Sequence, residues 1–286
     1  MPSVLIRFPG GLEKAVTLSY DDGVVEDIRL IEIMKKNGLR GTFNLNAGLY
    51  IAEDFVYPPE TRSWGRRLTR AQAIKLYRQD GIEPALHGYT HPRLESLPSA
   101  QMTNEVLSDR KEAEAMFEAP VRGMAYPYGT YNDTVLRVLA DCGVTYCRTV
   151  AATNSFALPK NWLEWNPTCH HNSPELENLT EKFLNEKPRG DYHDGWVFYL
   201  WGHSYEFGKD DNWARIENFA EKVGNRDDIW YATNMEIYEY IEAFRRLVFT
   251  LDQKTVYNPS SIPVWFRQKN VNYCVNPGEM LAFEAE

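Results

Sequence analysis

Residues 15–23 read Ala-Val-Thr-Leu-Ser-Tyr-Asp-Asp-Gly, an apolar run that ends in two adjacent carboxylates and a glycine. Such a run is typical of a buried strand, and Asp21 and Asp22 at its end place charge at an opening of the core. Gly23 can adopt conformations that bend the chain, so both carboxylates can reach one cavity with different roles. Taken alone, the pair favours a turn in which one carboxylate caps the helix that follows.

The chain around this strand alternates between strand and helix patterns. After the strand at residues 15–20, further strands are predicted at 40–46, 82–86, 121–125, 144–148, 195–201 and 229–232. Helical spacing of apolar residues predicts helices at 27–37, 70–79, 99–117, 134–142, 177–186, 213–223 and 235–247. About seven strand and helix pairs predict an α/β fold, a distorted (β/α)7 barrel similar to a TIM barrel, with its active site at the carboxyl ends of the strands.

The barrel pattern covers residues 1–247, and the rhythm changes after it. Residues 248–286 alternate apolar and polar residues between turns, which predicts a C-terminal β-hairpin extension packed on the barrel. Residues 47–68 are irregular and form a long insertion that can carry part of a binding cleft.

The composition limits the partners of the protein. The net charge of −9 and a pI near 5.3 argue against nucleic acid, because its recognition needs basic patches. No apolar run approaches the length needed to cross a bilayer, and the N-terminal residues lack the pattern of a secretory signal. We therefore expect a cytoplasmic protein with neither a membrane nor a nucleic-acid partner.

A second charged stretch, Leu86-His-Gly-Tyr-Thr-His-Pro92, follows another predicted strand. Gly88 and Pro92 favour a loop that holds the two histidines, His87 and His91. Two imidazoles and one carboxylate from another strand end fit a metal site that leaves coordination positions open for water and substrate. Iron oxygenases use the same ligand set, but their usual scaffold is an all-β double sheet, whereas this chain alternates strands and helices.

At four places the sequence resembles the polysaccharide deacetylase family, also called carbohydrate esterase family four, which includes chitin and peptidoglycan deacetylases. Ser19-Tyr-Asp-Asp-Gly23 is similar to the first signature of this family, and His87-Gly-Tyr-Thr-His91 is similar to the second. Tyr126-Pro-Tyr-Gly129 resembles the third and Leu200-Trp-Gly-His203 the last. The order and spacing of the motifs agree over about residues 15–245.

The resemblance implies a role for each matching residue. Asp22, His87 and His91 are the expected ligands of a divalent metal, with zinc as the first choice and cobalt, nickel, iron or manganese as alternatives. Asp21 is the expected general base towards water, and His203 the general acid that protonates the leaving amine. The backbone N–H of Tyr128 is expected to help hold the oxyanion.

The function implied by the resemblance is a metal-dependent hydrolase that cleaves an N-acyl amide, with N-acetyl on a sugar or oligosaccharide as the leading substrate. Two alternatives remain: an amidohydrolase of a small non-sugar amide, and a catalytically silent barrel that only binds carbohydrate. Asp21 and His203 together favour turnover, since mere binding does not require both. Whether chains associate into a homo-oligomer is left open by the sequence.

Three positions depart from the family pattern. Gly88 stands where the second signature usually has Ser or Thr, and Ala125 stands where an arginine often orients the catalytic Asp; Arg122 lies too far back to replace it. The usual Asp-Trp signature is absent, and an aromatic stretch before His170 and His171 takes its place. We expect these two histidines to be loop or cleft residues and not ligands.

Overall fold

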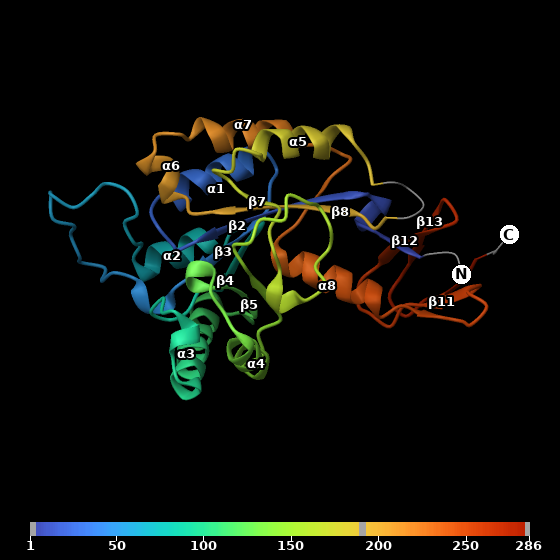
Figure 1. The fold of residues 1–286 in the computed structure, drawn as a ribbon, viewed down its shortest axis with the longest axis horizontal. Helices are drawn as coiled ribbons and strands as arrows, with labels where there is room; N and C mark the ends of the chain where they lie inside the picture. Colours follow the sequence, from blue (N-terminus) through green and yellow to red (C-terminus); the bar gives the residue numbers. More distant parts are fainter. Residues whose placement is uncertain (1–3, 189–192, 284–286) are drawn as a thin grey trace.

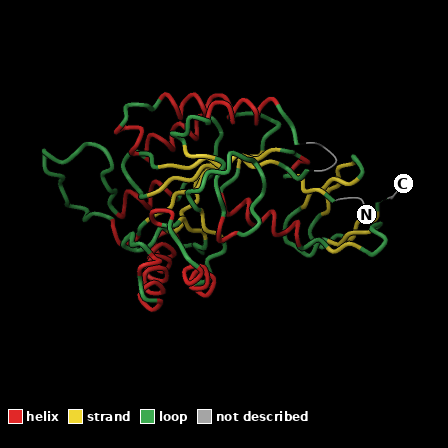
Figure 2. Tube along the Cα trace, in the orientation of Figure 1, coloured by secondary structure: helices red, strands yellow, loops and turns green. Residues whose placement is uncertain are grey.

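The protein is described here from a computed structural model, which covers residues 4–188 and 193–283. Seven parallel strands form its curled central sheet, and their spatial order is β6 (Tyr146–Arg148), β5 (Gly123–Ala125), β4 (Ile82–Leu86), β3 (Gly41–Leu45), β2 (Lys14–Asp21), β8 (Trp196–Gly202) and β7 (Cys169–His170). The short strand β9 (Trp230–Tyr231) pairs with the beginning of β2. The predicted distorted (β/α)7 barrel is confirmed (Figures 1 and 2).

Eight α-helices lie around the sheet in the described part of the chain. They are α1 (Asp27–Lys36), α2 (Arg70–Tyr77), α3 (Ser99–Phe117), α4 (Asp133–Asp141), α5 (Leu176–Asn185), α6 (Tyr205–Lys209), α7 (Ala214–Val223) and α8 (Asn234–Arg245). Helices α1, α5, α6 and α7 lie on one side of the strands in Figure 1, and α2, α3, α4 and α8 on the other. None of the described helices combines the length and apolar character that crossing a bilayer requires.

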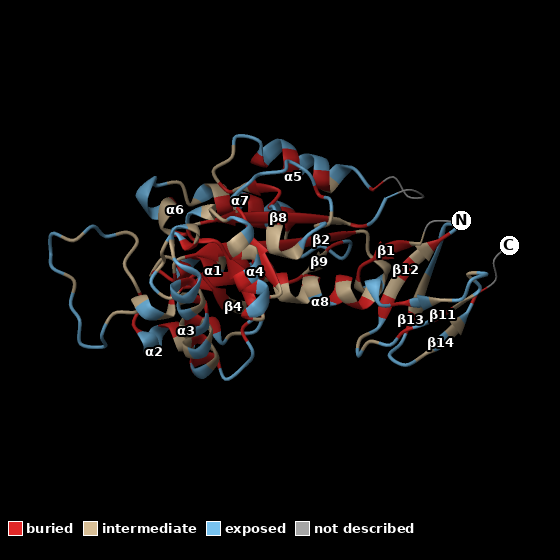
Figure 3. Ribbon diagram, turned by 60° about the horizontal axis from the view of Figure 1, so that its bottom comes forward, coloured by how far each residue is buried: buried red, intermediate tan, exposed pale blue. Residues whose placement is uncertain are grey.

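Strand β2 shows why this sheet is buried on both faces. Its eight residues are all buried (Figure 3). Val16, Leu18 and Tyr20 belong to the apolar core shared with the helices. Because side chains alternate along a strand, Ser19 and Asp21 face the opposite way, into the barrel, where Asn44 of β3 donates to both. Strand β2 thus contributes apolar side chains to the core on one face and polar side chains to the barrel interior on the other.

The C-terminal segment forms two small antiparallel sheets at the end of the barrel opposite α6 (Figure 1). One sheet consists of β10 (Val248–Phe249), β11 (Thr255–Tyr257) and β14 (Met280–Ala282). The other consists of β12 (Val264–Gln268), β13 (Val271–Val275) and β1 (Leu5–Arg7). The N-terminal strand β1, which the sequence pattern does not indicate, therefore joins this C-terminal structure.

Candidate active site

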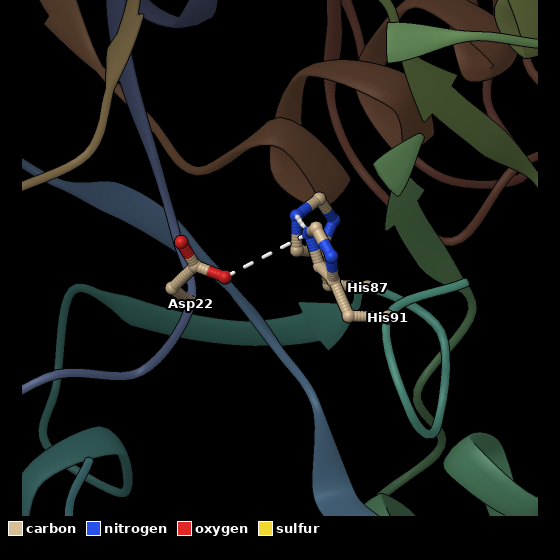
Figure 4. Close-up of side chains that lie close together, drawn as sticks. All are labelled: Asp22, His87 and His91. Carbon is tan, nitrogen blue, oxygen red and sulfur yellow. Dashed lines mark hydrogen bonds and ion pairs between the residues drawn. The ribbon is translucent and has the colours of Figure 1, made fainter. Parts of the chain in front are cut away.

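Asp22, His87 and His91 come together at the carboxyl ends of the strands (Figure 4). Asp22 follows β2 directly, His87 follows β4, and His91 lies in the loop beyond it. One ligand atom from each residue lies within 4.8 Å of the others. The Nε2 atoms of His87 and His91 are 3.2 Å apart, and Asp22 Oδ1 is 3.8 Å from His91 Nε2. The three residues that the sequence assigns to a metal do form one cluster.

Hydrogen bonds fix the orientation of the His87 ring. Its backbone N–H donates to Asp109 Oδ2 at 3.0 Å, and Nδ1 lies 2.9 Å from the carbonyl oxygen of Ala125. A carbonyl can only accept, so Nδ1 carries the proton and Nε2 keeps a free lone pair aimed at the cluster. Burial lowers the pKa of His87, and burial together with His87 lowers the pKa of His91 to about 4. Both imidazoles are therefore neutral at pH 7, which is the form that binds metals.

The spacing of the donor atoms suits a small divalent cation. Two nitrogens that bind one zinc ion tetrahedrally at about 2.05 Å are separated by about 3.3 Å. The observed separation of 3.2 Å between the two Nε2 atoms matches this value. Two imidazoles and a carboxylate also leave positions open for other ligands, as in catalytic sites. The residues present thus fit the metal that the family resemblance implies.

Three residues at the site have positive φ values, which are unusual for residues other than glycine. They are Asp22 (84°), His91 (58°) and Tyr128 (59°). Strained backbone of this kind collects at functional sites because the surrounding structure holds it in place. Tyr128 lies in the turn Pro127–Gly129 and its ring contacts His91, with centroids 4.6 Å apart. Within residues 4–188 and 193–283, no acceptor is found for its backbone N–H.

Asp21 lies beside this cluster, at the end of β2. Its Oδ2 is 3.8 Å from Nε2 of His87 and 3.8 Å from Nε2 of His203. Asn44 and Arg148 donate to its Oδ1 at 2.8 and 2.6 Å. Burial acts to raise the pKa of Asp21, but Arg148 and the two histidines outweigh it and lower the pKa to about 2. Asp21 is therefore a carboxylate at neutral pH.

Arg148 is a functional residue that the sequence analysis did not identify. Its side chain is completely buried at the end of β6, and it pairs with both oxygens of Asp21. In the register of the sheet, Arg148 lies directly alongside Ala125 of β5. The guanidinium that is missing at position 125 is thus supplied from the neighbouring strand. The available signal was an arginine at the end of a predicted buried strand.

His203, which follows β8, faces Asp21 on one side and Glu206 on the other. Glu206 Oε1 is 3.4 Å from His203 Nδ1, and this carboxylate comes from α6, a five-residue helix that the sequence analysis did not predict. Burial acts to lower the pKa of His203, but Glu206, Asp21 and Asp22 outweigh it and raise the pKa. Glu206 is therefore the acidic partner of this histidine on the side away from Asp21.

Glu206 also contacts the adjacent histidines His170 and His171, at 3.2 and 3.0 Å from Nε2. Burial acts to raise the pKa of Glu206, but the three surrounding imidazoles lower it. Nδ1 of His170 accepts from the backbone N–H of Asn172 at 3.1 Å, so in the neutral ring the proton resides on Nε2. His170 in this state donates to Glu206; His170, His203 and Glu206 also lie close enough together to form a second group of possible metal ligands.

Comparison with known proteins relates part of this chain to one family. The sequence profile named Polysaccharide deacetylase matches residues 10–147. This range contains the proposed metal ligands, Asp21 and Tyr128, whereas Arg148, His203 and Glu206 follow it.

Two curated relatives match over part of their length. An uncharacterised protein of Streptomyces coelicolor is 27% identical over 133 residues, which is 46% of this chain and 47% of that protein. A chitin deacetylase of Arthroderma benhamiae is 27% identical over 132 residues, 44% of this chain and 31% of that protein. The chain thus spans less than half the length of these relatives.

A solved structure has the same fold. The chitin deacetylase of Colletotrichum lindemuthianum superposes with a TM-score of 0.50 and 21% identity, covering 82% of this chain and 90% of the other.

Proposed function

Because the chain belongs, through residues 10–147, to the polysaccharide deacetylase family, we propose that it is a metal-dependent hydrolase of N-acyl amides, with an N-acetylated sugar or oligosaccharide as substrate. One observation carries this proposal. Oδ2 of Asp21 lies 3.8 Å from Nε2 of His87, a proposed metal ligand, and 3.8 Å from Nε2 of His203, the proposed general acid. A site that only binds carbohydrate does not need a base and an acid on either side of a metal cluster.

Asp22, His87 and His91 would hold the metal through one carboxylate oxygen and two Nε2 atoms. When bound, a divalent ion supplies Lewis acidity, which polarises the acyl carbonyl and makes water a stronger acid. We favour zinc because two imidazoles and one carboxylate are a ligand set of catalytic zinc sites, with cobalt, nickel, iron and manganese as alternatives. Arg67 Nη2, 3.2 Å from Asp22 Oδ1, orients the carboxylate from the side.

The chain's own groups divide the proton transfers. Asp21 is ionised and takes a proton from water as that water attacks the acyl carbon. The Tyr128 N–H donates to the carbonyl oxygen as negative charge develops on it. His203, whose pKa its acidic neighbours raise, gives a proton to the leaving nitrogen. The products are a carboxylic acid and a free amine.

The direct test is acetate release from a panel of N-acetylated sugars and small amides, with and without a chelator. We expect release from at least one sugar, its loss after chelation and its return when zinc or cobalt is added. Release from only the non-sugar amides would replace the sugar substrate by a small amide. Absence of release from every compound by the metal-loaded protein would leave a silent binding barrel as the correct assignment.

Removing a ligand is expected to remove the metal. His87→Ala and Asp22→Asn should each reduce bound zinc, measured by elemental analysis after gel filtration, from about one ion per chain to background, because two remaining ligands hold zinc weakly. His193→Ala changes a histidine outside the cluster and serves as the control, with metal content unchanged. Full occupancy in either ligand variant would disprove the ligand assignment.

Removing the charge of Glu206 is expected to change the pH dependence. His203 acts only when protonated, so kcat/KM falls as the pH rises through the pKa of His203. Glu206→Gln removes a carboxylate that raises this pKa. The alkaline limb of the kcat/KM profile should therefore move to lower pH, with a larger loss of rate at pH 8 than at pH 6. The control is Glu177→Gln on α5, whose carboxylate pairs with Lys222. An unmoved alkaline limb in Glu206→Gln would refute the pairing.

A further inference from the structure

A pocket of about 260 Å³ opens beside the proposed metal site, on the side of residues 62–67 and α6. The lining residues that matter here are Asp22, Arg62, Trp64, Arg67, Tyr205 and Lys209. We call it the Arg62–Lys209 pocket. Three cationic side chains and two aromatic rings thus surround a single carboxylate, in a chain whose net charge is −9.

The floor of the Arg62–Lys209 pocket is an aromatic pair. The rings of Trp64 and Tyr205 stack with centroids 5.9 Å apart and an interplanar angle of 20°. The Arg62 guanidinium lies 4.1 Å above the Trp64 ring, and Lys209 Nζ is 5.8 Å from it. This arrangement holds two positive charges close to the Trp64 ring.

The end of the insertion that carries Trp64 is fixed to the barrel. The backbone N–H of Gly65 donates to Glu26 Oε1 at 3.0 Å, and the N–H of Val25 donates to the carbonyl of Arg66 at 2.9 Å. The N–H of Arg67 donates to the Tyr57 hydroxyl at 2.7 Å. The pocket wall is therefore part of the folded structure, at the base of the loop that projects from the barrel in Figure 1.

The charges in the pocket are not balanced by the protein. Arg67 is already engaged, since it donates to Asp22 Oδ1 at 3.2 Å and to Asn46 Oδ1 at 3.1 Å. In the described ranges 4–188 and 193–283, no ion pair involves the side chain of Arg62 or of Lys209. Two cations thus remain available to a ligand, next to a third cation that neutralises the only carboxylate of the lining.

The pocket is continuous with the reaction centre. Asp22 belongs both to its lining and to the metal cluster. The Tyr205 ring lies between Trp64 and His203, with its centroid 5.3 Å from that of the His203 ring. A substrate whose acyl amide lies at the Asp22, His87 and His91 cluster can therefore reach the pocket with its next groups.

We propose that the Arg62–Lys209 pocket binds a carboxylate or phosphate group of the substrate, so that the preferred substrate is an acidic N-acyl amide such as an acidic N-acetylated sugar. This inference rests on the proposed deacetylase function and specifies its substrate class. Guanidinium and ammonium groups recognise both anions through charge-assisted hydrogen bonds. A polycationic amino-sugar chain is disfavoured at the same place.

The test compares three probes at constant ionic strength: N-acetylglucosamine, its 6-phosphate and N-acetylmuramic acid, which carries a carboxylate. Because charge-assisted contacts favour the acidic probes, kcat/KM should be about tenfold or more higher for at least one of them than for the neutral sugar. Comparison of the two acidic probes distinguishes phosphate from carboxylate. Raising the salt concentration should reduce the preference.

Substitutions in the Arg62–Lys209 pocket test whether this pocket causes the preference for acidic probes. Arg62→Gln and Lys209→Gln should each lower the ratio of acidic to neutral kcat/KM, and the double variant should bring it near one. Arg70→Gln removes an exposed arginine at the start of α2, which pairs with Glu112 and lies outside the lining, and should leave the ratio unchanged. Equal rates for all three probes, or a ratio that survives in the double variant, would overturn the proposal.

Binding measurements separate this inference from the proposed function. Calorimetric titration with the 6-phosphate, N-acetylmuramic acid and the neutral sugar requires no turnover. If the protein releases no acetate but binds an acidic probe more tightly than the neutral one, and the double variant loses this difference, the pocket is correct and the deacetylase function is wrong. If the protein releases acetate but shows no preference for the acidic probes, the deacetylase function is correct and the pocket assignment is wrong.

Discussion

Replacing Arg148 with methionine is expected to lower the free energy of unfolding by about 3–5 kcal/mol, as found when one member of a buried ion pair is removed. Arg148 is fully buried and its partner Asp21 is 3% exposed, so solvent cannot replace the lost charge. Urea denaturation measures this change through the midpoint at unchanged slope. The same variant should lose activity, since Arg148 holds the Asp21 carboxylate in place.

The control for this prediction is the double variant Asp21→Asn/Arg148→Met, in which neither charge is left unpaired. It should be more stable than the sum of the two single changes predicts, with a coupling free energy of about 0.5–3 kcal/mol. Additive losses in the double variant would show that the two residues do not act as a pair.

The pH dependence of stability provides a second readout of the same pair. The pKa of Asp21 is lowered to about 2 in the folded protein, below the value of about 3.9 in an unfolded chain. A carboxyl group with a lowered folded pKa stabilises the protein above the unfolded pKa, and this contribution disappears as the pH falls from about 4 towards about 2. The Arg148→Met variant should show a smaller loss in this window.

Replacing Asp21 with asparagine is expected to lower kcat by about 10²–10⁴ while the metal content stays constant. The amide cannot accept the proton that the carboxylate takes from water, but the proposed ligands Asp22, His87 and His91 remain. Rates are measured by acetate release and metal by elemental analysis. The thermal unfolding of the variant must be measured as well, because Asp21→Asn also leaves the buried Arg148 without its partner.

A matched change elsewhere tests whether this loss is specific. Asp80→Asn removes a carboxylate that pairs with Arg40 at 3.3 Å and is 95% exposed, and it should leave kcat unaltered. If Asp21→Asn turned over substrate as fast as the wild type, the base would have to be another group.

The barrel could be predicted from the sequence because its strands are apolar runs with clear ends. The strand predicted at 82–86 agrees with β4, and the one at 195–201 differs from β8 by one residue at each end. The short strand β7 and the five-residue helix α6 could not be predicted, because each is too short to show a period and is held by its neighbours. Strand β1 likewise has three residues and depends on pairing with β12.

The proposed metal ligands were predictable for a different reason. Asp22, His87 and His91 lie within contiguous motifs, so their residue types and spacing are visible in the sequence. The partners of the proposed base and acid, in contrast, lie outside these motifs and are brought together by the fold. Nothing in the linear pattern says that Arg148 lies alongside Ala125, or that Glu206 turns back towards His203 and His170. These contacts depend on the register of the sheet and on the position of helix α6, and both are set only in the folded structure.

The central place of β2 also has a consequence for biosynthesis. This strand leaves the ribosome well before β8, yet one of its two edges pairs with β8, where Lys14 lies alongside Trp196. A nascent chain that has not reached Trp196 therefore carries an apolar strand with one edge unpaired, a state prone to aggregation. The pairing of Asp21 with Arg148, 127 positions apart, likewise awaits the synthesis of β6. Chaperone demand should thus be highest before β8 is made and should fall once β8 can pair with β2.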